Sequence, residues 1–288
     1  MNKYFSLLSK IHIHPIFWVL IAIGAMTAQF KALCILFSIV FIHEMGHAVC
    51  ASFFSWRIKS IQLLPFGGVV EMEEHGNRPL KEDLFVVISG PIQHLWMQIA
   101  AWIFWEANFI NDSTYEMFIF FNMSIFLFNL VPIWPLDGGK LLFILLSKQK
   151  PFSVAHKEML RISAVVFSCL FLFLLFFNPT LLSGWIIAAF IVHSIYTEYK
   201  QRQFVYIRFL MERYYGNHQA FTVLKPIIVD RDDLIYHVLL KFQRGCKHPI
   251  IVEDDGKKLF QLDENELLHS FFSEKKTDGK MGDLQYVY

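Results

Sequence analysis

The chain of 288 residues lacks any excess of one charge sign, because 26 Lys and Arg residues are matched by 25 Asp and Glu residues. A formal net charge of +1 provides no overall field for nucleic acid, so we expect no direct nucleic-acid binding. The four cysteines form no C-x-x-C pair, which argues against a disulfide framework and against cysteine zinc ligands. No small-residue cleavage site follows the short basic start, so we expect the first apolar segment to be retained.

Apolar side chains, in contrast, are abundant: 55% of the residues are hydrophobic and 31 are Phe. This composition excludes an ordinary water-soluble domain and indicates a membrane protein. Six apolar runs are long enough to cross about 30 Å of hydrocarbon. They cover residues 13–28, 32–54, 84–105, 115–133, 162–177 and 181–196. We therefore predict an α-helical, multi-pass membrane domain of six transmembrane helices over residues 1–199.

The positive charges between these runs fall almost entirely on one side of the membrane. That side collects residues such as Arg57, Lys59, Lys148 and Lys157, whereas the other side holds Lys31 alone. Because cytoplasmic connections are enriched in Lys and Arg, both termini are predicted to be cytoplasmic.

The second apolar run contains the motif His43-Glu44-Met45-Gly46-His47. Two histidines four residues apart lie on one face of a helix, so their ring nitrogens can converge on one metal ion, with Glu44 placed to act on a water molecule there. Polar residues that only help helices to pack need neither this spacing nor a carboxylate. Each of these polar residues resists membrane insertion by about 1 to 3 kcal/mol, which favours a functional role. A catalytic zinc usually takes three protein ligands, so a third must come from elsewhere.

Asp137 is the natural third ligand. Pro132 and Pro135 stop the preceding helix, and Gly138 and Gly139 follow the aspartate directly, so we expect irregular backbone at membrane depth. Such backbone is tolerated there only when it lines a buried or wet cavity. An N-cap role for Asp137 in a short following helix is the simpler alternative, and it is compatible with metal binding.

Three further features are less specific. Asn129, about two turns before Asp137, can donate a hydrogen bond into the same cavity. Gly67 and Gly68 lie in an alternating segment that forms either a kinked strand or re-entrant loop close to the site, or an ordinary interfacial turn. His94 follows Ser89-Gly90-Pro91 in the third run, and a packing or hydrogen-bonding role is favoured over metal binding for it.

Taken together, these motifs resemble the site-2 protease family of intramembrane zinc metalloproteases, over about residues 13–199. The resemblance implies a metalloendopeptidase in which His43, His47 and Asp137 bind one zinc ion per chain. It implies that Glu44 is the general base. A substrate-binding or carbonyl-orienting role is implied for four further residues: Asn129, Gly67, Gly68 and Pro135.

The resemblance extends to sporulation members of that family found in bacilli. It implies a membrane-associated sigma-factor precursor as the protein substrate, membrane-protein inhibitors or regulators as partners, and a location in the membrane that surrounds the forespore. Two departures concern the third and fourth runs: many relatives have Asn where this chain has His94, and Pro where it has Trp134. They leave the ligand set intact but put a substrate-clamping role of the third run in question.

After the last apolar run the composition changes. Residues 200–220 read as a charged and aromatic helical linker, and residues 221–288 read as strand, helix, strand, helix, with a hairpin turn at Asp254-Asp255-Gly256. This small α/β module resembles a single CBS domain, which implies ATP as a regulatory ligand and a homo-oligomer or partner that covers its exposed face. The polar tail from Lys275 is expected to be loose.

Two other functions use the same residues. A zinc transporter or metal-sensing membrane protein would bind zinc at these ligands in transit, and an inactive scaffold would present the C-terminal module to partners. A transporter is expected to show repeat symmetry between its halves, and the sequence shows none.

Overall fold

The computed structural model describes residues 11–13, 24, 26–64, 67–72, 78–216 and 223–284. Most of the first predicted run, residues 13–28, therefore lies outside the described residues. The chain divides into two compact units, and each is considered by itself. The first unit takes residues 1–74, 81–142 and 162–195, and the second takes residues 75–80, 143–161 and 196–288. The domain boundaries drawn from the sequence remain a prediction.

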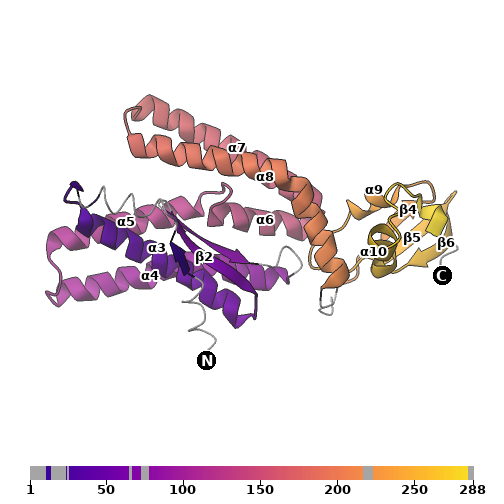
Figure 1. The fold of residues 1–288 in the computed structure, drawn as a ribbon, viewed down its shortest axis with the longest axis horizontal. Helices are drawn as coiled ribbons and strands as arrows, with labels where there is room; N and C mark the ends of the chain where they lie inside the picture. Colours follow the sequence, from indigo (N-terminus) through magenta and orange to yellow (C-terminus); the bar gives the residue numbers. More distant parts are fainter. Residues whose placement is uncertain are drawn as a thin grey trace. The chain divides into compact units, whose positions relative to one another are not determined.

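Helices dominate the first unit. It contains α3 (Phe30–Phe53), α4 (Leu80–Glu106) and α5 (Asp112–Leu130), which lie side by side in Figure 1. It also contains the beginning of α6 (Asp137–Gln149), the later part of α7 (Phe152–Phe177) and the first part of α8 (Leu182–Tyr215).

The predicted runs match these helices. The second to sixth runs correspond to α3, α4, α5, α7 and α8, although α7 begins ten residues earlier than the run and α8 continues far beyond it. Among the helices in the described residues, α3, α4 and α7 are long and apolar enough to cross a membrane. A mostly helical membrane protein is thus confirmed, and the count of six spans remains a prediction.

Close helix packing in the first unit depends on Gly46. A Cβ atom at this position would lie 2.7 Å from the backbone oxygen of Ser89 on α4. Small residues let membrane helices approach one another in this way. The helix that carries the histidine motif is thereby held directly against α4.

A small sheet lies beside α3. Strand β1 (Ile11–Ile13) pairs in parallel with β2 (Ile58–Leu64), and β2 pairs antiparallel with β3 (Gly67–Met72). Gly68 is opposite Leu63 in the register, and both β2 and β3 contact α3. The segment of Gly67 and Gly68 is therefore a strand next to the motif helix, as one of the two alternatives predicted, and not a simple turn.

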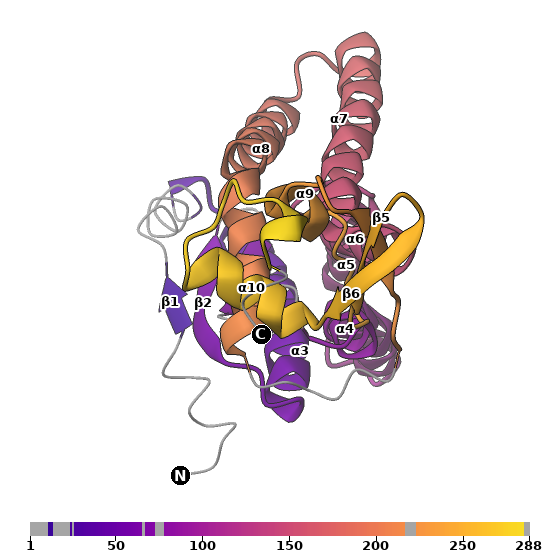
Figure 2. The same cartoon turned by 90° about the vertical axis from the view of Figure 1, so that its right-hand side faces the viewer.

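The second unit contains the C-terminal α/β module. Its strands are β4 (Ile227–Asp230), β5 (Ile250–Asp254) and β6 (Lys257–Leu262), in the order β4-β5-β6, with β4 and β5 parallel and β5 and β6 antiparallel. Its helices are α9 (Ile235–Leu239) and α10 (Glu264–Phe272), which Figure 2 shows beside the β5–β6 hairpin. The predicted order of strands and helices is confirmed, with β6 added after the hairpin turn.

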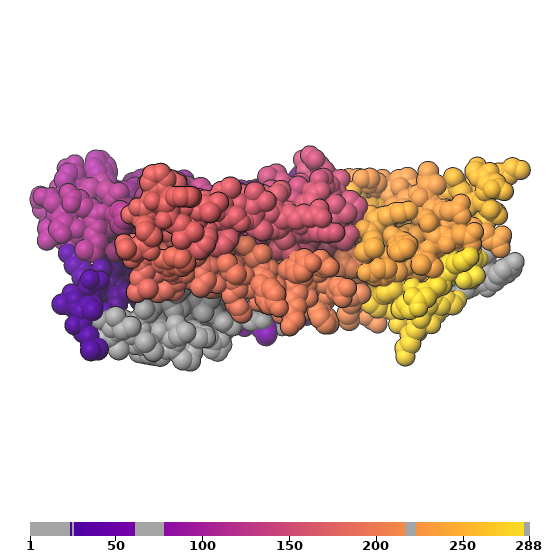
Figure 3. All heavy atoms as spheres, turned by 90° about the horizontal axis from the view of Figure 1, so that it is seen from above, coloured from indigo at the N-terminus to yellow at the C-terminus, as the bar shows by residue number. Residues whose placement is uncertain are grey.

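The predicted linker over residues 200–220 is helical as far as Tyr215 in the described part of the chain. Helix α8 continues without a break to Tyr215, and its last turns join the hydrophobic core of the module. The residues that α7 and α8 contribute to this core are Phe152, Tyr206, Phe209 and Leu210. In Figure 3 the atoms from the end of α8 onward, orange to yellow, form one continuous group. The predicted linker, residues 200–220, is thus largely helix α8 packed into the module.

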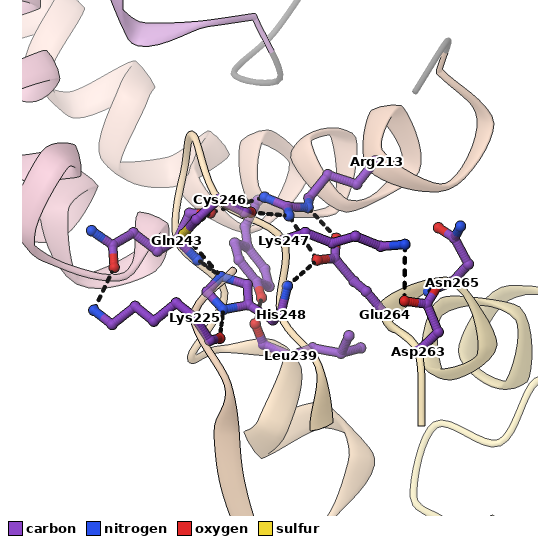
Figure 4. A network of polar contacts seen from close by, with 11 residues as sticks. Arg213, Lys225, Leu239, Gln243, Cys246, Lys247, His248, Asp263, Glu264 and Asn265 are labelled. Atoms are coloured by element: carbon purple, nitrogen blue, oxygen red, sulfur yellow. Dashed lines mark hydrogen bonds and ion pairs between the residues drawn. The ribbon is translucent and has the colours of Figure 1, made fainter. Parts of the chain in front are cut away.

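A buried ion pair fixes this packing. Arg213, in the last turn of α8, binds both carboxylate oxygens of Glu264, with one N–O distance of 2.8 Å, and it donates to the backbone oxygens of Gln243 and Cys246 (Figure 4). The Glu264 carboxylate also accepts the backbone N–H of His248. A buried guanidinium is tolerated because each of its neighbours can accept a hydrogen bond.

The predicted loose tail is wrong for the described residues up to 284. A 3-10 turn, η1 (Met281–Leu284), buries both of its apolar ends, Met281 and Leu284, in the module core. The backbone N–H of Met281 donates to the oxygen of Asp233. Two apolar residues in a polar stretch produce no periodic pattern, which is why the sequence did not reveal this contact.

Candidate metal centre

Three side chains converge in the first unit. The Nε2 atoms of His43 and His47 are 3.2 Å apart, and each lies 3.1 Å from Oδ2 of Asp137. All three side chains are almost completely buried. The structure therefore brings together the three residues that the sequence predicted, and among the described residues it gives no other group of this kind.

Two helices supply these atoms. His43 and His47 are one turn apart on α3, so their rings leave the helix on the same side. Asp137 is the first residue of α6, directly after the turn that contains Pro132 and Pro135. The expected irregular backbone therefore ends just before Asp137, and the aspartate sits in the first turn of a helix.

The triangle of ligand atoms has the size that a metal ion requires. A tetrahedral zinc ion with bonds of about 2.0 to 2.1 Å separates its ligand atoms by about 3.3 Å. The three observed distances are 3.1 to 3.2 Å. The donor set of two imidazole nitrogens and one carboxylate oxygen also suits zinc.

The second nitrogen of each histidine has a partner of its own. Nδ1 of His47 lies 2.7 Å from the backbone oxygen of Val86, which can only accept, so Nδ1 carries a proton and Nε2 of the neutral ring is unprotonated. Nδ1 of His43 lies 3.0 Å from Nε2 of His94. His94 is thus a hydrogen-bond partner of a ligand, as favoured from the sequence, and it does not belong to the ligand group.

Asp137 is held through its other oxygen. Nζ of Lys140 lies 3.0 Å from Oδ1 of Asp137, three residues along α6. This contact leaves Oδ2 to face the histidines. Sequence reasoning missed Lys140, although the spacing of three residues on a helix was a readable signal.

Gly90 provides the space for the rings. A Cβ atom here would lie 2.9 Å from Cε1 of His43 and closer still to the imidazole of His47. No side chain larger than hydrogen fits unless the rings move. Helix α4 runs through Ser89-Gly90-Pro91 without a break, and the contact of Gly90 with the rings could not be foreseen from the sequence.

Glu44 lies between the two histidines on α3 and is buried. Of the residues expected to meet substrate, Asn129 is near the end of α5, Pro135 is in the turn before α6, and Gly67 and Gly68 begin β3. These four residues lie on elements next to α3 or α6, which carry the three converging side chains. Their contact with substrate remains a prediction.

This fold and site define a class, the metal-dependent proteases of the membrane, and comparison with known proteins gives the family. The model of peptidase family M50 matches residues 31–112 and 105–175, about half of the chain. The chain belongs to this family. The prediction of a metalloprotease is therefore confirmed, against the transporter and scaffold alternatives.

Two relatives and one solved structure illustrate the relationship. The chain is 52% identical to stage IV sporulation protein FB of Bacillus subtilis (strain 168) over 288 residues, the full length of both. It is 34% identical over 118 residues to zinc metalloprotease MJ0392 of Methanocaldococcus jannaschii, covering 40% of this chain and 34% of the relative. The solved site-2 protease from Methanocaldococcus jannaschii matches with a TM-score of 0.52 at 26% identity, over 65% of this chain and 89% of that one.

Proposed function

We propose that His43, His47 and Asp137 bind one zinc ion per chain and that Glu44 is the general base of peptide hydrolysis inside the membrane. The observation that carries this proposal is the triangle of ligand atoms 3.1 to 3.2 Å apart, drawn from two helices. When bound, zinc supplies Lewis acidity that polarises the scissile carbonyl and acidifies water.

The residues of the chain carry out the remaining steps. The carboxylate of Glu44 takes the proton from the attacking water and then delivers it to the leaving amine nitrogen. Lys140 keeps the Asp137 carboxylate oriented. Asn129 donates a hydrogen bond to the substrate carbonyl. Pro135 shapes the turn that positions this carbonyl.

The edge of β3 offers a way to hold an extended substrate. In the described part of the chain, β2 pairs with β1 on one side and β3 on the other, so β3 is one of the two edge strands of the sheet. A helical substrate hides its amides and must unwind near the scissile bond. We propose that the unwound segment adds as a strand along Gly67 and Gly68, where the absence of side chains allows close approach.

Metal analysis and cleavage assays test the metal site and the base separately. Purified Asp137→Ala is expected to lose zinc, whereas Glu44→Gln is expected to keep zinc and lose cleavage. Stoichiometric, tightly held zinc in Asp137→Ala would remove this residue from the site. Unchanged cleavage by Glu44→Gln would exclude it as the base.

A membrane-associated sigma-factor precursor is the proposed substrate, with the enzyme in the membrane around the forespore and membrane-protein inhibitors controlling it. This proposal is supported by the resemblance to sporulation members of the family and by the full-length similarity to a stage IV sporulation protein. Co-expression of wild type or Glu44→Gln with candidate precursors tests it. Processing that is equal in both strains would reject the candidate.

Six spans with both termini in the cytoplasm are proposed from the Lys and Arg asymmetry. Labelling of single introduced cysteines with an impermeant reagent from outside should miss Lys59→Cys and Lys157→Cys and reach Asn111→Cys. The reverse pattern would refute the orientation.

The CBS-like module is proposed to bind ATP and to contribute to a homo-oligomer. The side chain of Ile228 on β4 is 60% exposed, so one face of the module sheet offers apolar surface. Cleavage by the full-length enzyme with and without ATP tests the regulation, and mass measurement of the detergent complex tests the oligomer. Rates that do not respond to ATP would reject the regulatory role.

A further inference from the structure

A chain of hydrogen bonds leads from α5 through α4 to the metal ligand His43. Oδ1 of Asn122 lies 2.7 Å from Nδ1 of His94, and Nε2 of His94 lies 3.0 Å from Nδ1 of His43. All three side chains are buried, with His94 2% and Asn122 1% exposed.

The direction of this chain is set at Asn122. Its Nδ2 donates to the backbone oxygen of His94 at 3.0 Å and to Oε1 of Gln98 at 3.0 Å. Both partners are oxygen acceptors, so the amide nitrogen must point toward them. The other amide atom, Oδ1, therefore faces His94 and can only accept.

The protons on the two rings follow from this orientation. Nδ1 of His94 must carry a proton in order to donate to Oδ1 of Asn122, which leaves Nε2 of the neutral ring as an acceptor. Nδ1 of His43 then donates to that nitrogen, and Nε2 of His43 is left bare. That bare nitrogen is the atom that faces Asp137 at 3.1 Å.

We propose that Asn122 and His94 are positioning residues that hold His43 in the one tautomer able to bind the metal. The proposal rests on the metal site described above and assigns a role to two residues outside it. His47 achieves the same tautomer through the backbone oxygen of Val86, which no substitution removes. His43 depends on a side chain instead, so its tautomer can be changed by mutation.

A metal site with a histidine ligand commonly loses about 10- to 100-fold in metal affinity when the hydrogen-bond partner of the other ring nitrogen is removed. Both nitrogens of His94 are already engaged, one with Asn122 and one with His43, so His94 acts through the ligand and not as a ligand.

The experiment measures zinc affinity of the full-length protein in detergent by competition with a chromophoric chelator, together with thermal unfolding of the zinc-free protein. His94→Leu removes the acceptor and is expected to weaken zinc binding about 10- to 100-fold. Gln93→Leu is the matched control, because Gln93 is the neighbouring polar residue on α4 and its amide bonds Ser89 and Trp96 instead. It is expected to leave zinc affinity unchanged.

Two conservative variants separate positioning from packing. A glutamine at position 94 reaches as far as Nε2 of the imidazole, so His94→Gln can still accept the proton of His43. An asparagine reaches only as far as Nδ1, so His94→Asn keeps the contact with Asn122 and loses the contact with His43. The proposal predicts tighter zinc binding by the glutamine variant than by the asparagine variant, at similar unfolding temperatures of the zinc-free proteins.

The combination of His94→Leu with Asn122→Leu gives a further measure. Because both residues act through one chain of bonds, the double variant should bind zinc no more weakly than His94→Leu alone. Wild-type zinc affinity in His94→Leu, or an asparagine variant equal to the glutamine variant, would overturn the proposal. His43→Ala is assayed in parallel: if it retained zinc, the metal site itself would be wrong, whereas loss of zinc there with wild-type affinity in His94→Leu would reject only the positioning role.

Discussion

Replacement of Gly90 by alanine tests how tightly the two imidazoles are confined. In most helix interiors Gly→Ala stabilises a protein by about 0.4 to 1 kcal/mol, because it restricts the unfolded chain. At Gly90 the added Cβ would lie 2.9 Å from the ring of His43 and closer to that of His47, so a ring or a helix must shift. Overpacking of this kind costs about 1 to 3 kcal/mol, which exceeds the helix-propensity gain.

The strain is expected to appear in metal binding, because the atoms displaced belong to the proposed metal ligands. If the whole cost falls on the metal-bound state, zinc affinity decreases by about 5- to 150-fold. The assay is chelator competition with purified Gly90→Ala. Gly184→Ala is the control, since its Cβ would meet only the flexible end of the Leu174 side chain, at 2.9 Å. Wild-type zinc affinity in Gly90→Ala would show that the rings have room to move, and would refute the reasoning.

Three further predictions concern charges and protons. Lys140→Met removes the ion pair to Oδ1 of Asp137 and should weaken zinc binding by about fivefold or less, because the lysine side chain is 41% exposed. A larger loss of zinc affinity in chelator competition would contradict this weak contribution. Arg213→Met leaves the buried Glu264 carboxylate without its guanidinium partner and should destabilise the C-terminal unit by about 3 to 5 kcal/mol. The double variant Arg213→Met, Glu264→Leu should be destabilised less. Denaturant unfolding that ranks the two variants the other way would contradict the ion-pair argument. Burial lowers the pKa of His248, so the unfolded chain takes up a proton at a higher pH than the folded chain does. Stability should therefore decrease as the pH falls through about 6.5, which thermal unfolding at pH 5 to 8 would show. His248→Gln should flatten this pH dependence.

The convergence of His43, His47 and Asp137 could be predicted because it depends on local geometry. A spacing of four residues on a helix places His43 and His47 together whatever the rest of the fold, and prolines followed by glycines mark where the chain turns before Asp137. The strand at Gly67 and Gly68 was one of two predicted alternatives, because an alternating pattern with a glycine pair fits both a strand and a turn.

The supporting residues could not be predicted, because their contacts join helices that are apolar on every side. Such helices carry no amphipathic stripe that would reveal which face meets which neighbour. The pairing of His94 with His43, 51 residues earlier, and with Asn122, 28 residues later, depends on the packing of α3, α4 and α5. The same holds for Gly90, whose role is visible only once the rings are in place.

The structure also changes how the role of the C-terminal module can be tested. Removal of residues 221–288 would uncover Phe152, Tyr206 and Phe209, which α7 and α8 bury in the module core, and would leave Arg213 without Glu264. In addition, Nε2 of Gln243 donates to the backbone oxygen of Lys148 at the end of α6, at 2.6 Å, and this hydrogen bond would be lost. Lost cleavage after truncation would therefore report damage to helix ends as readily as lost regulation. Only changes on the exposed sheet face, which leave the core and the Arg213 network intact, can separate the two.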